Sequence, residues 1–120
     1  MVKTVSLPYH LDSVKQRVGI LALKHKEAMK RTVDVTKEER KKVFDALISL
    51  PIKVWPSEAN FLLFKPESID AYKLWQELIE EGILIRDCSS WEGLEGCLRV
   101  TIGSENENDI FLDAVRKILK

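Results

Sequence analysis

The chain has 120 residues, of which 45% are hydrophobic and 32% charged, a profile typical of a globular domain. Lysine plus arginine and aspartate plus glutamate both number 19, so the formal net charge is zero. That balance argues against a large nucleic-acid-binding surface, which needs a basic excess. The sequence shows neither an apolar run long enough to span a bilayer nor an N-terminal signal segment. We expect a single domain over residues 1–120, located in the cytoplasm.

The first part of the chain is predicted to be helical. Asp12 or Ser13 is a candidate N-cap for a first helix. The apolar positions of that helix, at helical spacing, are Val14, Val18 and Leu21. Further on, "TKEE" has the pattern of a capping box, which predicts a second helix that begins at Thr36 and stops at Pro51.

The middle of the chain is predicted to hold two strands and a helix. Residues 52–55 form a short strand candidate, and residues 59–65 are apolar on both faces, as in a central strand. Ser68 is the expected N-cap of the helix, and Gly82 its C′ residue, where a left-handed conformation costs glycine little. The apolar positions of the helix are Ile69, Tyr72, Trp75, Leu78 and Ile79.

Two further strands and a helix complete the predicted order. Residues 83–86 are one strand candidate, and residues 97–103 are a clearer one. Alternation puts Leu98, Val100 and Ile102 on its core face and Cys97, Arg99 and Thr101 on the other. "SENE" is a second capping box, at the start of a final helix. The apolar positions of this helix are Ile110, Phe111, Ala114, Val115, Ile118 and Leu119. This order predicts an α+β fold with helices packed on a small, largely antiparallel sheet.

Arg86 and Arg99 are the main candidates for a binding function. The planar fork of arginine donates two parallel hydrogen bonds to carboxylate or phosphate. If the two strands are neighbours, both side chains can converge on one anion; the alternative is that they are solvated charges at strand ends. Asn60 is a weaker candidate, because an asparagine there can equally satisfy a turn. Trp91, in the long loop between the strands, is either a lid or a residue packed on the sheet edge.

The remaining residues predict no catalytic centre and no metal site. His10 and His25 are isolated, and Ser89 and Ser90 lack the setting of a nucleophile. Cys88 and Cys97 do not match zinc-ligand spacings, so we expect reduced thiols, with a disulfide only if their strands pair. Trp55 and Trp75 are predicted core residues.

Three stretches carry a resemblance to a known family: "WPSEANFLLFK", "GILIRDCSSW" and "CLRVTIGSENENDIFLDAVRKIL". They resemble the C-terminal part of histidinol-phosphate aminotransferases, whose strands have the patterns S-x-A-N-F-x-L-F, G-[IV]-x-[IV]-R and L-R-[IV]-[ST]-[IV]-G. "LPYHLDSVKQ" also matches, so the resemblance covers nearly the whole chain. It implies the small domain of the aspartate-aminotransferase fold. It also implies one long helix through Thr36, against the capping box there.

The resemblance implies roles for the candidate residues. In that family, the arginine matching Arg99 binds the anionic group of the substrate, and the one matching Arg86 lines the same pocket. The match to Asn60 lies on a strand that enters the active site. The implied reaction is amino transfer between histidinol phosphate and 2-oxoglutarate, in histidine biosynthesis.

The resemblance also implies what these 120 residues do not supply. The family's enzymes use pyridoxal 5′-phosphate, held by a larger domain that carries the Schiff-base lysine. No lysine here stands in that motif, so we expect no bound cofactor and no transamination from this chain alone. Its expected partners are the larger domain and a small phosphorylated amine. A helix within residues 1–23 would normally contact the larger domain, and its partly bare stripe predicts self-association or fraying.

Other interpretations stay open at this stage. "RDCSSW" also resembles threonine-phosphate decarboxylases, which share the fold, although "RVTIG" favours the aminotransferase. A non-enzymatic anion-binding or regulatory module would present a complete pocket. A pure association module would form a stable homo-oligomer and bind no ligand.

Overall fold

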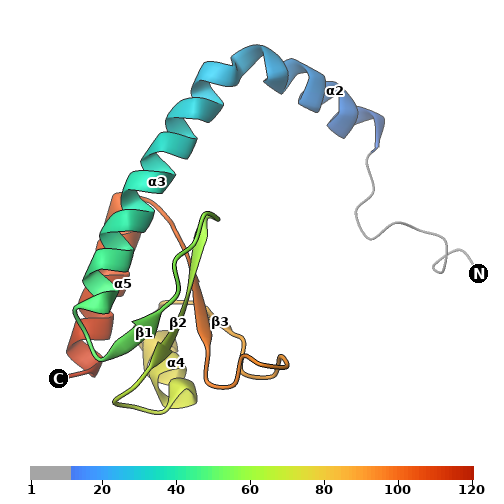
Figure 1. The fold of residues 1–120 in the computed structure, drawn as a ribbon. Coiled ribbons are helices and arrows are strands. Elements are labelled where there is room, and N and C mark those ends of the chain that lie inside the picture. The colour runs from blue at the N-terminus through green and yellow to red at the C-terminus, as the bar shows by residue number, and fades with distance from the viewer. Residues whose placement is uncertain (1–11) are drawn as a thin grey trace, which may run out of the picture. The chain divides into compact units, whose positions relative to one another are not determined.

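The computed structural model describes residues 12–120, and these divide between two compact units. The first unit ends at Val33 and is helical, and the second comprises Asp34–Lys120 and contains the sheet (Figure 1). Within the described residues, no helix is both long and apolar enough to cross a membrane.

The described part of the first unit contains helix α2 (Ser13–Ala22), a short 3-10 turn η1 (Leu23–His25) and the start of α3. Asp12 is the N-cap of α2, since its carboxylate accepts from the Lys15 backbone N–H at 2.8 Å. No α2 residue is buried, and Val14 and Val18 are 69% and 58% exposed. Hydrophobic side chains are therefore accessible along this unit. Pro8 and His10 lie outside the described residues.

Helix α3 (Lys26–Ile48) is continuous, so the capping box predicted at Thr36 is wrong. Thr36 lies inside the helix, as the family resemblance implied. The β-branched residues around it lower helix propensity by only tenths of a kcal/mol each. If a separate helix began at Thr36, its first four backbone N–H groups would lose their partners within the helix. That loss costs more free energy than the low helix propensity of the β-branched residues.

The sheet contains β1 (Ile52–Val54), β2 (Phe61–Pro66), β3 (Arg86–Asp87) and β4 (Leu98–Thr101). All neighbouring pairs are antiparallel, and the strand order is β1-β2-β4-β3, which confirms the predicted fold class and places β2 inside the sheet. The strand predicted at 83–86 is shorter than expected, because only its last residue pairs with β4.

Helices α4 (Ala71–Glu80) and α5 (Glu105–Ile118) carry well-defined caps. The predicted Ser68 cap is wrong: Asp70 caps α4, and its carboxylate accepts from the backbone N–H groups of Tyr72 and Lys73. The buried face of α4 shifts accordingly. Its buried residues are Ala71, Leu74 and Leu78, whereas Tyr72 and Ile79 are exposed. The predicted capping box of Ser104 and Glu107 is confirmed, and so is the left-handed Gly82 with a φ of 79°.

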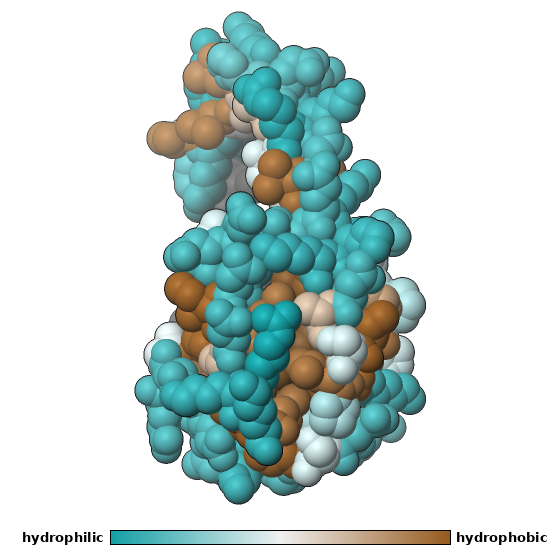
Figure 2. Space-filling view, turned by 90° about the vertical axis from the view of Figure 1, so that its left-hand side faces the viewer, coloured by the Kyte–Doolittle hydropathy of each residue, from teal (hydrophilic) through white to brown (hydrophobic). Residues whose placement is uncertain are grey.

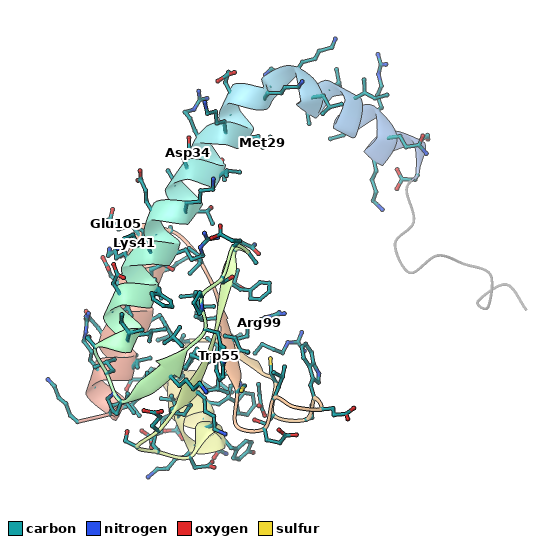
Figure 3. All side chains as sticks on the ribbon, in the orientation of Figure 1. Met29, Asp34, Lys41, Trp55, Arg99 and Glu105 are labelled. Atoms are coloured by element: carbon teal, nitrogen blue, oxygen red, sulfur yellow. The ribbon has the colours of Figure 1, made fainter. Side chains whose placement is uncertain are left out.

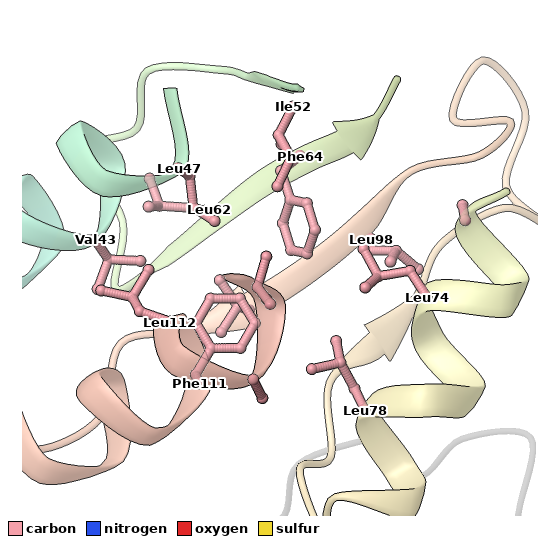
Figure 4. Packing of buried hydrophobic residues seen from close by; sticks show 14 of the residues in the cluster. Val43, Leu47, Ile52, Leu62, Phe64, Leu74, Leu78, Leu98, Phe111 and Leu112 are labelled. Carbon is pink, nitrogen blue, oxygen red and sulfur yellow. The ribbon is translucent and has the colours of Figure 1, made fainter. Parts of the chain in front are cut away.

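The core lies between one face of the sheet and helices α3, α4 and α5 (Figure 4). Phe64 on β2 meets Phe111 on α5 edge to face, with ring centroids 6.1 Å apart. The fully buried large side chains include Val43, Leu47, Leu62, Phe64, Leu74, Leu78, Leu98 and Leu112. Ile110, predicted in the stripe of α5, is 51% exposed.

The outer side of α3 and α5 mixes charged and apolar groups (Figure 2). Lys42 on α3 lies 2.7 Å from Asp109 and 3.7 Å from Glu105, both on α5. These ion pairs are solvent-accessible, so each contributes little to stability. The two helices cover only one face of the sheet, which leaves the opposite face to be considered for function.

Candidate functional site

Arg86 and Arg99 are direct cross-strand partners in the β3–β4 pair. Arg99 alternates with Leu98 and Val100, which are buried in the core, so both arginines project from the opposite face of the sheet. Directly opposed residues have Cβ atoms about 5 Å apart, and like charges in such a pair are destabilising.

The register extends this face into two rows across the four strands. One row runs through Trp55, Leu63, Arg99 and Arg86, because Trp55 donates its N–H to the Leu63 carbonyl and Leu63 pairs with Arg99. The neighbouring row contains Lys53, Lys65, Cys97 and Cys88. Trp55 therefore lies on the arginine face and not in the predicted core. Figure 3 shows Arg99 and Trp55 over the sheet, away from Lys41 and Glu105. We call this surface the arginine face.

Within residues 12–120, no carboxylate lies within ion-pair distance of either arginine. The acidic residues in adjoining segments are engaged elsewhere. Asp87 accepts from the Ser89 N–H at 2.8 Å, Glu95 from the Gly93 N–H at 3.1 Å, and Glu58 pairs with Arg40 at 3.0 Å. The positive charge of the arginine face is thus uncompensated by these groups.

Arg99 is half-buried, and its guanidinium carbon lies 4.9 Å from the centroid of the Phe61 ring. Its Nε atom is buried and has no hydrogen-bond partner among the described residues. Buried polar atoms are nearly always paired, so an orphaned donor at a charged group is a mark of function or of an unseen acceptor. Arg86 is exposed at the sheet edge.

The two cysteines lie on the same face, next to the arginines. Both are buried free thiols, and the Cys88 N–H donates to the Cys97 carbonyl at 3.0 Å. Burial raises the pKa of Cys88, while the nearby Arg99 and Arg86 charges act in the opposite direction. The thiol and both guanidinium groups therefore share one electrostatic environment.

Asn60 is not brought together with the arginines. It is exposed at the start of β2, and its carbonyl accepts from the Ile102 N–H at 2.9 Å. Leu63, the partner of Arg99, lies three positions further along the strand, roughly 10 Å away. Asn60 is also two residues from Leu62, so strand alternation places it on the core face and not on the arginine face. Trp91 is 49% exposed in the loop after Cys88.

The arginine face is distinct from the surface hollow beside α5. A surface hollow of about 450 Å³ lies between residues 82–85 and the start of α5, and neither arginine lines it. Its polar side chains are already used: Glu107 belongs to the capping box, and Asn108 bonds to the Gly103 backbone. The candidate site is therefore the arginine face.

One residue of the arginine face, and one buried residue at the turn after β4, were not singled out from the sequence. Phe61 lies two residues before Leu63, so alternation alone would have put it on the arginine face. Asn108 is buried and bonds to Gly103 and to Glu39 of α3, at 2.7 Å for the latter. Asn108 lies three and four residues before the apolar Phe111 and Leu112, so it shares their helix face. This spacing could have predicted that Asn108 is buried.

Comparison with known proteins places the chain in a family. Residues 1–115 match the model for "Aminotransferase class I and II". The chain is 39% identical over 119 residues to the histidinol-phosphate aminotransferase of Streptomyces avermitilis, covering 99% of this chain and 31% of that protein. It thus spans about a third of the length of the curated relatives it matches.

Solved structures agree with this assignment. The histidinol-phosphate aminotransferase from Clostridium acetobutylicum superposes with a TM-score of 0.84 at 29% identity, over 98% of this chain and 36% of that one. The L-threonine-O-3-phosphate decarboxylase from Porphyromonas gingivalis gives a TM-score of 0.59 at 28% identity, over 69% and 27%. Sequence and fold therefore lead to one conclusion: the chain belongs to the class I and II aminotransferase family.

Proposed function

We propose that the chain serves as the substrate-binding small domain of a histidinol-phosphate aminotransferase, with Arg86 and Arg99 binding the phosphate or carboxylate of the substrate. The single observation that carries this proposal is the direct pairing of two arginines that no described carboxylate neutralises. The similarity to histidinol-phosphate aminotransferases supports the choice of substrate. Asn60 enters the proposal as a peripheral contact only.

The chemistry of the arginine face suits a phosphorylated substrate. A phosphate group carries a charge of about −1.5 to −2 at neutral pH. One such group can therefore relieve the repulsion between two adjacent guanidinium groups. Hydrogen bonds in which both partners are charged are about twice as strong as neutral ones. The binding energy thus comes from correcting an arrangement that is unfavourable in the free chain.

The residues of this face offer guanidinium groups to an anion, but they do not offer a free lysine to the aldehyde of the family's cofactor, pyridoxal 5′-phosphate. Its two lysines are engaged, since Lys65 donates to the Glu95 carbonyl at 2.9 Å and Lys53 lies 4.9 Å from the Trp55 ring centroid. Neither forms an ion pair with a described carboxylate. We expect the Schiff-base lysine to come from the family's larger domain, as a partner in the cytoplasm. Transamination by this chain alone is not expected.

A threonine-phosphate decarboxylase-like small domain is the second candidate. It is favoured by the structural similarity to the decarboxylase from P. gingivalis. Its substrate also carries a phosphate, so it assigns the same role to Arg86 and Arg99. A self-sufficient regulatory anion-binding module is less well supported, because residues 1–115 match an enzyme family, the class I and II aminotransferases.

Side-chain NMR of the labelled chain tests the proposal. The Nε–H signals of Arg86 and Arg99 would be followed during separate titrations with histidinol phosphate, O-phosphothreonine and inorganic phosphate. We expect both signals to shift together. At the same ligand concentration, histidinol phosphate should cause the largest shifts of the three ligands. Arg116, paired with Asp113 at 3.0 Å on α5, is the internal control and should not move. Equal shifts at Arg116, or none at the arginine pair at millimolar ligand, would contradict the proposal.

A further inference from the structure

We infer that Phe61 is a positioning residue for Arg99. Its ring holds the guanidinium in the orientation that receives the substrate anion, without neutralising the positive charge. The inference rests on the proposed function and deepens it, since it names what orients one of the two anion-binding groups.

The sheet register sets up this contact. Phe61 pairs with Thr101, and Leu63 pairs with Arg99, so Phe61 is the diagonal neighbour of Arg99 on the same face. Diagonal neighbours lie about 7–8 Å apart at the backbone, within reach of long and aromatic side chains. The guanidinium carbon accordingly lies 4.9 Å from the ring centroid. That separation is within the range of a cation–π interaction.

An aromatic ring can orient the Arg99 guanidinium without occupying the N–H groups that bind the anion. A carboxylate would orient the guanidinium by ion pairing, but it would also compete with the substrate anion for the same N–H groups. The face of a ring attracts the cation through its quadrupole and leaves the N–H edge of the fork free. Because Nε is buried without an acceptor, the two terminal nitrogens are the groups that Arg99 can offer outward.

The backbone around Phe61 is itself anchored to α3 and β4. Arg40 of α3 donates to the Ala59 carbonyl at 2.8 Å and pairs with Glu58 at 3.0 Å. The Asn60 carbonyl accepts from the Ile102 N–H at 2.9 Å. Phe61 follows these anchored residues directly, so the backbone that carries its ring is held in place. A ring on a fixed backbone restricts the rotamers of Arg99 before any ligand arrives.

The test compares the 120-residue wild-type chain with Phe61→Leu, which removes the ring, and Phe61→Tyr, which keeps it. Two quantities are measured: the position of the Arg99 Nε–H signal without ligand, and the Kd for histidinol phosphate. In wild type and Phe61→Tyr, the Arg99 signal should be displaced by the ring, unlike that of Arg86. In Phe61→Leu it should move to the position of Arg86, and Kd should rise about two- to tenfold. The conservative variant should keep Kd within about twofold.

The outcomes separate the two proposals. If wild type binds histidinol phosphate and Phe61→Leu binds equally well with an unchanged backbone spectrum, the positioning role is wrong and the proposed function stands. If wild type does not bind at all, the proposed function fails and the inference fails with it. Should Phe61→Leu not fold, the wild-type spectrum decides: an Arg99 signal at the position of Arg86 would overturn the inference.

Discussion

The two faces of the sheet are built by the same four strands in opposite ways. On the core face, Leu62, Phe64 and Leu98 are fully buried against three helices. On the arginine face, two like charges stand directly opposite each other and lack an ion-pair partner among the described residues. One face gains its free energy from packing within the chain. The other retains an unfavourable arrangement, and this contrast is the basis of the proposal that its partner is a ligand.

The largest expected effect is on the core face. Phe64→Ala should lower the free energy of unfolding by about 3–5 kcal/mol, because it removes a fully buried ring and leaves a cavity. Chemical denaturation monitored by circular dichroism measures this change. Thr101→Ala is the matched control on the exposed face and should change stability by less than about 0.5 kcal/mol. Comparable losses in both variants would remove the contrast between the faces.

The next largest effect is expected on ligand affinity, with little change in the free energy of unfolding. Arg99→Gln should weaken histidinol phosphate binding by roughly ten- to a hundredfold, the cost of about 1.5–3 kcal/mol for losing a charged hydrogen-bond partner. The free energy of unfolding should stay level or rise slightly, because a like-charge repulsion is removed. Isothermal calorimetry and denaturation on the same variant measure both quantities. A clear loss of stability would mean that Arg99 is a structural residue.

A smaller effect is expected at the turn that joins the arginine strand to α5. Asn108→Ala leaves the Gly103 backbone groups and Glu39 without their buried partner. Stability should fall by about 1–3 kcal/mol, as for other buried hydrogen-bond partners. Thermal unfolding measures the change. Ser49→Ala, at an exposed residue whose hydroxyl bonds only the Ala46 carbonyl in the preceding turn, is the comparison and should cost less.

The smallest effect is a pH dependence at the start of α5. The Ser104 hydroxyl and backbone N–H lower the pKa of Glu107 below its usual value. Its contribution to stability is therefore fully present above the unfolded-state pKa of about 4.3 and is lost as the pH falls through the lower folded-state pKa. The free energy of unfolding should decline from about pH 5 downwards, with a shallower decline in Glu107→Gln. Identical pH profiles for the two proteins would exclude this contribution.

Local signals in the sequence predicted the fold class and the face of Arg99. Period-two alternation assigned Arg99 to the side away from Leu98, and the Ser104 capping box located α5. Propensity failed at Thr36, where the continuity of a long helix outweighed a local cap pattern. It also failed at Ser68, because the helix begins after Asp70.

The candidate site was only partly predictable, because it depends on strand pairing. The sequence offered the convergence of Arg86 and Arg99 only on the condition that their strands are neighbours, and the register meets that condition. The Phe61 contact with Arg99 joins residues 38 positions apart through the β2–β4 pair, which no local pattern specifies. Asn60, chosen for its residue type, lies away from the pair because alternation and distance place it elsewhere.

A double-mutant cycle in the binding of histidinol phosphate tests the central claim most directly. The dissociation constants of wild type, Arg86→Gln, Arg99→Gln and the double variant would be measured at one ionic strength. If the two arginines bind one anion, each single variant should weaken binding strongly. The double variant should then be clearly tighter than the product of the two single effects predicts. Single effects near zero, or effects that multiply as for two independent sites, would contradict a shared anion-binding site.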